Sequence, residues 1–194
     1  MNTESTKEIK EISAQAGLVS PAATAPAPVH RSPGEGGEFL HNSLGIRLTV
    51  PEVVQEIISF MQADLTRQYK VTIGTDSELF DKNKADFVTA IVVHRVGNGG
   101  RYFWRKLDTQ KTHSLRERII KEVLISLDVA KDTLAELKKF PLPKFDFEIH
   151  IDVGANGPTK VLIQEVVNMV RANNFEPRTK PESYAASNIA DRHV

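Results

Sequence analysis

The predicted order of helices and strands favours an α/β domain built on a mixed five-stranded sheet. Three strand patterns follow one another closely between residues 71 and 107, and helix and strand patterns alternate after that. Strands joined by short turns pair antiparallel, whereas strands joined through a helix pair parallel and carry their helices on the faces of the sheet. A further helix pattern precedes the first strand, so the domain gains an N-terminal helix.

Composition narrows the classes of function. The chain has 194 residues, of which 25 are basic, 25 are acidic and none is cysteine. This length suits one domain with a core and a tail. A net charge of zero provides no overall basic surface, so any nucleic-acid site must be local. The lack of cysteine excludes disulfides, thiol catalysis and cysteine-bound zinc.

The first part of the sequence has the composition of a tail. Four of the ten prolines fall between Pro21 and Pro33, and the segment Gly34-Glu35-Gly36-Gly37 follows. Such a stretch cannot bury enough apolar surface to offset the entropy of ordering it. We predict a disordered N-terminal tail over residues 1–37, either flexible or partner-binding, and a folded domain over residues 38–194.

The sequence lacks the patterns of a membrane protein and of an exported one. No apolar run approaches the length of a membrane span. The N-terminal region carries Glu4, Glu8 and Glu11 and lacks the apolar stretch of a signal peptide. We therefore expect a cytoplasmic protein without a membrane partner.

The first helix and the three strands after it have clear local signals. Thr49 and Glu52 have the spacing of a capping box, and apolar residues recur at helical spacing from Val53 to Leu65. The strands are predicted at Val71–Ser77, Phe87–Arg95 and Arg101–Leu107, the last two joined by a glycine-rich turn. The first strand carries Asp76 at the point where we expect it to end or bend.

Alternating helices and strands make up the rest of the domain. Ser114 and Glu117, at capping-box spacing, open a long helix that ends before Pro141. The remaining elements are a strand at Phe145–Val153, a helix from Pro158 to Asn173, a strand at Phe175–Lys180 and a helix from Tyr184 to about Arg192. Pro177 places the last strand at or near an edge of the sheet.

Four acidic residues fall at points that this order can bring together: Asp76, Glu122, Asp152 and Asp191. If the fourth strand lies beside the first, Asp76 and Asp152 are neighbours, and helices packed on the sheet supply the other two. Clustered carboxylates repel one another and need a compensating cation. Oxygen ligands suit Mg²⁺ or Mn²⁺, and two such ions can activate water against a phosphodiester. All four residues are therefore predicted as catalytic residues and metal ligands.

Two of these assignments have alternatives. Glu117 lies on the opposite flank of the apolar stripe that Glu122 borders, so it can cap its helix or take the place of Glu122 as the ligand. Asp191 shares a helical stripe with Tyr184 and Asn188. A polar face of this kind on a terminal helix can also be only solvated, and both alternatives stay open.

Other polar residues have weaker functional signals. His193 can shuttle a proton, and Lys160 can contact a phosphate at a helix N-terminus, although a surface position also explains each of them. Aromatic and basic side chains interleave on the third strand, which suits either stacking with single-stranded nucleic acid or a half-buried strand. These side chains are Arg101, Tyr102, Trp104, Arg105 and Lys106. His113 and His150 are expected as structural or surface groups.

A combination of motifs resembles the YkuK-like family of ribonuclease H-like proteins over about residues 38–194. The motifs are Ile73-Gly74-Thr75-Asp76-Ser77, Ile91-Val92-Val93-His94-Arg95, Gly99-Gly100-Arg101-Tyr102, Asp152-Val153-Gly154 with Gly157 and Thr159-Lys160, and Ser183-Tyr184-Ala185-Ala186-Ser187. The resemblance implies a ribonuclease H-like fold for the sheet described above. Less directly, it implies a metal-dependent nuclease that hydrolyses phosphodiester bonds of RNA or DNA at a two-metal carboxylate site.

Two other functions stay open. The first is a ribonuclease H-like module that binds nucleic acid or protein without turnover, because a shared fold does not determine activity. The second is nucleotide hydrolysis, since the actin-like relatives of this superfamily share the fold. The sequence lacks the GxxxxGK[ST] pattern of a Walker-type nucleotide site.

Overall fold

The computed structural model describes residues 39–194, except for the side chains of Ala186 and Ser187. The tail predicted over residues 1–37 lies outside the described residues and stays a prediction. The strands are β1 (Leu40–Asn42), β2 (Arg47–Leu48), β3 (Tyr69–Asp81), β4 (Lys84–Arg95), β5 (Gly100–Lys111), β6 (Phe145–Ile151) and β7 (Glu176–Arg178). The helices are α2 (Val50–Gln62), α3 (Leu115–Leu137) and α4 (Ile163–Ala172), with the shorter turns η2 (Pro158–Leu162), η3 (Ala185–Ala190) and η4 (Asp191–His193).

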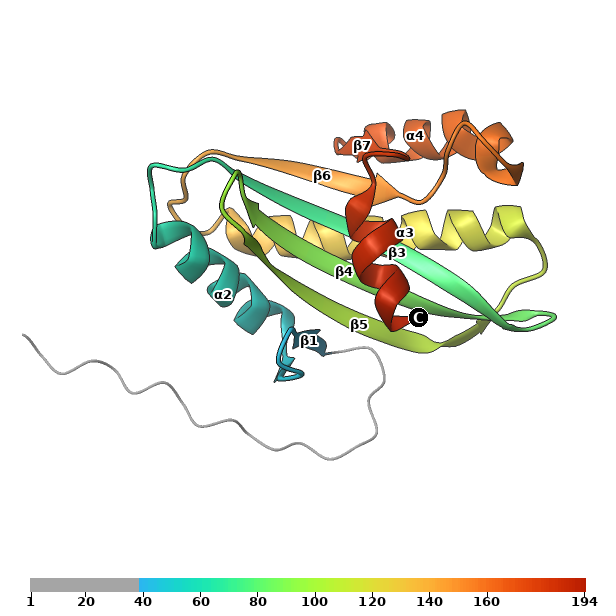
Figure 1. The fold of residues 1–194 in the computed structure, drawn as a ribbon, viewed down its shortest axis with the longest axis horizontal. Coiled ribbons are helices and arrows are strands. Elements are labelled where there is room, and N and C mark those ends of the chain that lie inside the picture. Colours follow the sequence, from blue (N-terminus) through green and yellow to red (C-terminus); the bar gives the residue numbers. More distant parts are fainter. Residues whose placement is uncertain (1–38) are drawn as a thin grey trace, which may run out of the picture. The chain divides into compact units, whose positions relative to one another are not determined.

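The strands form one mixed seven-stranded sheet in the order β2-β1-β5-β4-β3-β6-β7 (Figure 1). β3, β4 and β5 pair antiparallel as a meander, β6 pairs parallel with β3, and β7 pairs parallel with β6. The predicted mixed α/β fold, a meander followed by alternating helices and strands, is confirmed. The sheet has two more strands than predicted, because β1 and β2 are too short to produce a hydropathy pattern.

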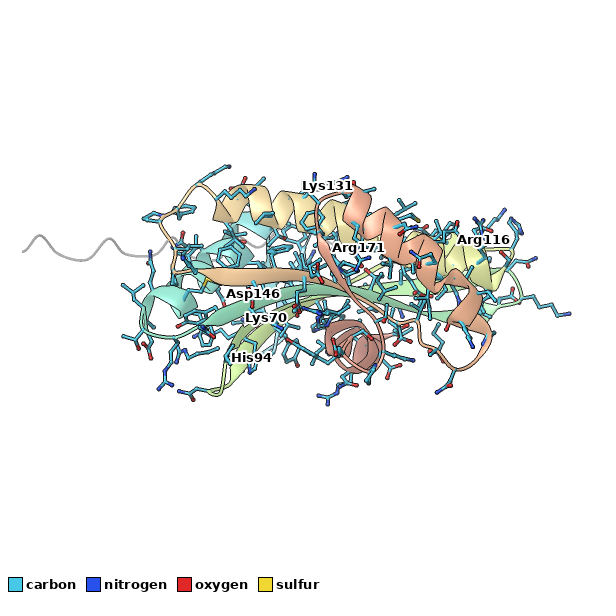
Figure 2. The ribbon with its side chains drawn as sticks, turned by 90° about the horizontal axis from the view of Figure 1, so that it is seen from above. Lys70, His94, Arg116, Lys131, Asp146 and Arg171 are labelled. Atoms are coloured by element: carbon cyan, nitrogen blue, oxygen red, sulfur yellow. The ribbon has the colours of Figure 1, made fainter. Side chains whose placement is uncertain are left out.

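The two faces of the sheet are covered differently. The main core fills the space between one face and helices α2, α3 and α4, and includes the fully buried Val71 and Ile73. Figure 2 shows α3 and α4 on that side and the C-terminal turns on the other. There a small cluster of Val88, Ala90 and Ala190 packs η3 against the sheet. Within residues 39–194, none of the helices is long and apolar enough to cross a bilayer.

Local signals explain how the elements begin and turn. The backbone N–H of Thr49 donates to Oε2 of Glu52 at 2.7 Å, and that of Glu52 donates to Oγ1 of Thr49 at 3.4 Å, which completes the predicted capping box of α2. The hairpin between β4 and β5 turns through Gly97 and Gly99, whose φ values of 78° and 70° favour glycine. α2 ends before Leu65, which was predicted to continue its apolar stripe and is exposed instead.

Two elements near the candidate site differ from the prediction. β3 continues to Asp81 instead of ending at Ser77, because β4 pairs with it along its whole length. Asp76 therefore lies in the middle of a strand. The C-terminal segment is a π-helical turn followed by a 3₁₀ turn that begins at Asp191. The predicted α-helical stripe from Tyr184 to Asp191 is therefore wrong, because its spacing assumes a continuous α-helix.

Candidate metal and active site

Asp76 and Asp152 occupy the same row across the neighbouring parallel strands β3 and β6. Thr75 and Ile151 form the last pair of these strands, and each aspartate follows directly after its strand's member of the pair. Neighbouring strands lie about 4.8 Å apart. Both carboxylates therefore emerge at one place on the sheet, and burial, followed by the charge of Asp152, raises the pKa of Asp76.

Asp76 points to the face of the sheet that carries η3. Thr75 and Ser77 point the other way, because each hydrogen-bonds with a side chain of α3, and successive strand residues alternate between the faces. Val88, the partner of Asp76 on β4, packs with Ala190 in the cluster beneath η3.

Asp76, Asp152 and Asp191 share one electrostatic environment. Burial, followed by the charges of Asp152 and Asp191, raises the pKa of Asp76 to about 6. The backbone N–H of Ser77 and the guanidinium of Arg118 oppose this rise. Asp191 is exposed and begins η4, directly after η3. Two further carboxylates within electrostatic reach of Asp76 favour a cation beside it.

Glu122 approaches β3 from the opposite face of the sheet. It lies on α3 with 3% of its surface exposed. Oγ of Ser77 donates to Oε1 of Glu122 at 2.5 Å, whereas Oε2 is buried and lacks a hydrogen-bond partner among the described residues. Burial, together with the charges of Asp76 and Asp152, raises the pKa of Glu122 to about 8, against the effect of the Ser77 hydrogen bond. Glu122 thus protonates much more readily than an ordinary glutamate.

Lys180 neutralises Asp152 directly. His150 on β6 pairs with Arg178 on β7, so Asp152 and Lys180, each two residues further along, stand in the same row. Nζ of Lys180 lies 2.9 Å from Oδ2 of Asp152. Oδ1 of Asp152 is buried and has no hydrogen-bond partner in the described part of the chain. Asp76 on β3, Asp152 just after β6 and Lys180 two residues after β7 therefore lie in one row, which we call the acidic row.

The four predicted ligands do not form a closed ion site. Among residues 39–194, no three acidic or histidine side chains lie close enough together to hold one ion. β3 separates Asp76 from Glu122, and Lys180 contacts one oxygen of Asp152. The donor chemistry nevertheless fits a hard divalent cation, because every candidate ligand is a carboxylate and two buried oxygens, Oε2 of Glu122 and Oδ1 of Asp152, lack partners within the described residues.

Comparison with known proteins identifies the family. A family model described as ribonuclease H-like matches residues 52–194. The chain belongs to the ribonuclease H-like family. A relative, the uncharacterized protein YkuK of Bacillus subtilis (strain 168), is 32% identical over 168 residues, which cover 79% of this chain and 95% of the relative. The predicted resemblance to the YkuK-like family is thereby confirmed. No solved structure matches the chain significantly.

In this ribonuclease H-like domain, Glu117 lies apart from the acidic row. Its Oε2 accepts a hydrogen bond from the backbone N–H of His113 at 2.8 Å, and Nζ of Lys121 lies 3.0 Å from its Oε1. The hydrogen bond from His113, followed by that from Lys121, lowers the pKa of Glu117. Glu117 therefore caps α3, and Glu122 is the α3 carboxylate that contacts β3.

The aromatic and basic groups of β5 are separated by the pleat of the strand. The ring of Trp104 stacks on that of His193, with centroids 4.0 Å apart and an interplanar angle of 6°. Tyr102, two residues away, shares this face with Trp104. Arg101 instead contacts Glu56 of α2 on the other face, at 3.4 Å. β5 thus presents no continuous interleaved surface, and the stack holds η4 against the sheet.

His150 is a structural group, which is one of the two roles expected for it from the sequence. Its Nδ1 accepts a hydrogen bond from the backbone N–H of Ala185 at 3.1 Å, and its Nε2 lies 3.4 Å from Oε2 of Glu148. The ring is 1% exposed, and this burial lowers the pKa of His150 to about 4. A neutral His150 therefore anchors the start of η3, which leads to Asp191. The alternation of β6, which puts His150 and Asp152 on one face, is the sequence signal for this role.

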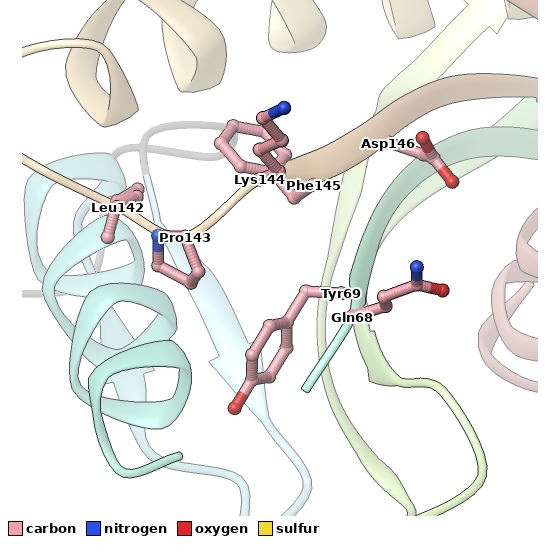
Figure 3. Close-up of a pocket in the computed structure, with 7 residues that line it drawn as sticks. All are labelled: Gln68, Tyr69, Leu142, Pro143, Lys144, Phe145 and Asp146. Atoms are coloured by element: carbon pink, nitrogen blue, oxygen red, sulfur yellow. The ribbon is translucent and has the colours of Figure 1, made fainter. Parts of the chain in front are cut away.

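Two hollows lie away from the acidic row. One, of about 610 Å³, opens where β3 and β6 begin, and Tyr69, Phe145 and Asp146 are among its lining residues (Figure 3). The other, of about 440 Å³, lies beside η3 and is lined in part by Val92 and Tyr102. Within the described chain, neither hollow is lined by any of the four predicted ligands.

Proposed function

We propose that this ribonuclease H-like domain is a metal-dependent nuclease that hydrolyses phosphodiester bonds of RNA or DNA. The observation that carries the proposal is that Asp76 and Asp152 each directly follow the last residue pair of the parallel strands β3 and β6, while Oδ1 of Asp152 lacks a partner among the described residues. Neighbouring carboxylates need a cation if they are to stay ionised together. Membership of the family supports this function, although a shared fold alone does not determine it.

In this proposal all four carboxylates are ligands of Mg²⁺ or Mn²⁺. Asp76 and Asp152 would bind the ions, and Glu122 and Asp191 would complete the ligand set. When bound, such ions polarise a phosphodiester as Lewis acids and neutralise the carboxylates. Asp76, with a pKa of about 6, is mostly ionised at neutral pH. Glu122, with a pKa of about 8, keeps its proton until a positive charge offsets its burial.

Ser77 and Arg118 position the helix carboxylate relative to the strand. Oγ of Ser77 donates to Glu122, and Nη1 of Arg118 donates to the carbonyl oxygen of Ser77 at 2.9 Å. Because Ser77 directly follows Asp76, these two bonds fix the register between α3 and the acidic row. A change at either residue therefore moves Glu122 relative to Asp76.

The proposal is tested by melting temperature in EDTA and in Mn²⁺. The wild type should melt about 5–10 °C higher when the ion is present at about a hundred times its Kd. The rise should disappear in the isosteric variant Asp76→Asn. It should persist in the matched control Asp146→Asn, because Asp146 is exposed near the start of β6. Equal stabilisation of the wild type and Asp76→Asn would place the ion elsewhere.

A second function has a specific observation in its favour. Lys180 already neutralises Asp152, and Ser77 already hydrogen-bonds with Glu122, so the chain itself partly satisfies the site. This arrangement suits a ribonuclease H-like module that binds nucleic acid or protein without turnover. A wild type that binds labelled RNA or DNA, but that Mn²⁺ does not stabilise, would favour this module over the nuclease.

A further inference from the structure

Lys180 is held at the acidic row by its backbone. Its N–H donates to the carbonyl oxygen of Val153 at 2.9 Å, which places it beside the segment that leaves β6. Gly154 packs against it closely, since a Cβ added to Gly154 would lie 3.2 Å from Cβ of Lys180. These contacts hold the backbone around residue 180 opposite Asp152, and they do not depend on the position of the ammonium group.

The side chain of Lys180 can leave Asp152 without disturbing these anchors. The side chain of Lys180 is 50% exposed and that of Asp152 is 20% exposed. Lysine carries a compact charge on a flexible stem, and an ion pair with this much solvent contact is weak. A divalent cation carries twice the charge and competes for the same carboxylate.

We propose that Lys180 is the resident counter-ion of Asp152, that it gives way to a divalent cation, and that it then binds a phosphate oxygen of the nucleic acid. This inference rests on the proposed function. Before an ion is present, the ammonium group neutralises Oδ2 of Asp152. Once Asp152 is occupied, the backbone anchors keep Lys180 at the site with its charge unpaired. Lys180 is then available to bind a phosphodiester of the nucleic acid, because lysine binds phosphate as a point charge.

The exchange of partners predicts two effects of opposite sign. Removal of the ammonium group should strengthen ion binding, because Asp152 loses a competing cation. The same change should weaken the binding of nucleic acid, because a phosphate contact is lost. A lysine that only stabilises the fold would not shift the two affinities in opposite directions.

The experiment compares Lys180→Gln with Lys180→Arg, which keeps the charge, and with Lys131→Gln, which removes an exposed lysine of α3 (Figure 2). The ion affinity is the Mn²⁺ concentration that gives half of the rise in melting temperature. The nucleic-acid affinity is measured in saturating Mn²⁺ by fluorescence anisotropy. The probe is a labelled single-stranded phosphorothioate oligonucleotide, which keeps its charges and resists cleavage.

Lys180→Gln should lower the half-saturating Mn²⁺ concentration about threefold. It should also weaken oligonucleotide binding about threefold to tenfold and reduce the salt slope of that binding by about 1. Lys180→Arg should keep the oligonucleotide affinity, and Lys131→Gln should keep both affinities. If Mn²⁺ stabilises the wild type but Lys180→Gln leaves both affinities unchanged, or moves them in the same direction, the inference fails alone. A wild type that Mn²⁺ does not stabilise overturns the proposed function and this inference with it.

Discussion

Ser77 donates a hydrogen bond of 2.5 Å to Glu122, and so joins the strand that carries Asp76 to the helix that carries the buried carboxylate. The bond uses Oε1 and leaves Oε2 of Glu122 buried without a partner in the described part of the chain. Burial disfavours the charged form of such a group. Without a cation, Glu122 is therefore a group that opposes folding as the pH rises.

Glu122→Gln should stabilise the metal-free protein at high pH. The pKa of Glu122 is raised from 4.5 to about 8 in the fold, so between these pH values the unfolded state releases a proton that the folded state keeps. The contribution of Glu122 to the free energy of unfolding therefore falls as the pH rises through this window. The variant has no such loss. Its free energy of unfolding relative to that of the wild type should therefore rise by about 1–3 kcal/mol from pH 5 to pH 8. Urea unfolding in EDTA at both pH values measures the gain.

Glu117→Gln is the matched control for this experiment. Hydrogen bonds lower the pKa of Glu117, so its stabilising contribution is largely present above its ordinary pKa of 4.5 and is lost only below that value. The free energy of unfolding of Glu117→Gln should therefore lie below that of the wild type by similar amounts at pH 5 and pH 8. If Glu122→Gln gained nothing over the wild type between these pH values, Glu122 would have to be ionised in the fold.

His150→Leu should loosen the C-terminal turns. The substitution removes the acceptor of the Ala185 N–H, and an unsatisfied buried donor costs about 1–3 kcal/mol. Hydrogen exchange over residues 184–193 should become faster, while exchange in β4 changes little. His113→Leu alters an exposed histidine and should leave exchange over residues 184–193 as it is in the wild type. Unchanged exchange in His150→Leu would show that other contacts hold η3.

Deletion of residues 1–37 should leave the melting temperature of the domain nearly unchanged. The composition of this segment predicts that it buries little apolar surface. Thermal unfolding of the full chain and of the shortened chain measures the difference. A drop of more than about 5 °C, which corresponds to about 2 kcal/mol at this size, would show that the segment packs on the domain.

Much of the sheet could be predicted because its signals are local. The strict alternation from Phe145 to Ile151 marks β6, and the glycines after Arg95 mark the hairpin into β5. The helix between β5 and β6 imposes a parallel crossover. The proximity of Asp76 and Asp152 was predicted only on the condition that β6 lies beside β3, and the structure meets this condition. β1 and β2 were not predictable in this way, since they are defined by their pairing with β5 and with each other.

The details of the candidate site depend on contacts between distant parts of the chain. The hydrogen bonds from Ser77 to Glu122 and from Ser126 to Thr75 show which face of β3 packs against α3. Asp76 therefore points to the opposite face. The partnership of Lys180 with Asp152 requires the exact register of β6 and β7, and a slip of one residue would turn Lys180 to the other face. The π-helical turn before Asp191 departs from the 3.6-residue period, so no helical stripe could place that residue.

Cleavage of nucleic acid by the wild type and by Asp152→Asn tests the central claim most directly. The assay spans single strands, duplexes, hybrids and branched DNA in Mg²⁺ or Mn²⁺, and circular dichroism confirms that each variant keeps the native fold. The account predicts that the wild type cleaves at least one substrate and that Asp152→Asn and Asp76→Asn abolish cleavage, because each removes a charge and a ligand without changing side-chain shape. Glu122→Gln should lower cleavage strongly and Glu117→Gln only slightly. A wild type that cleaves none of these substrates and binds no divalent ion would contradict the account.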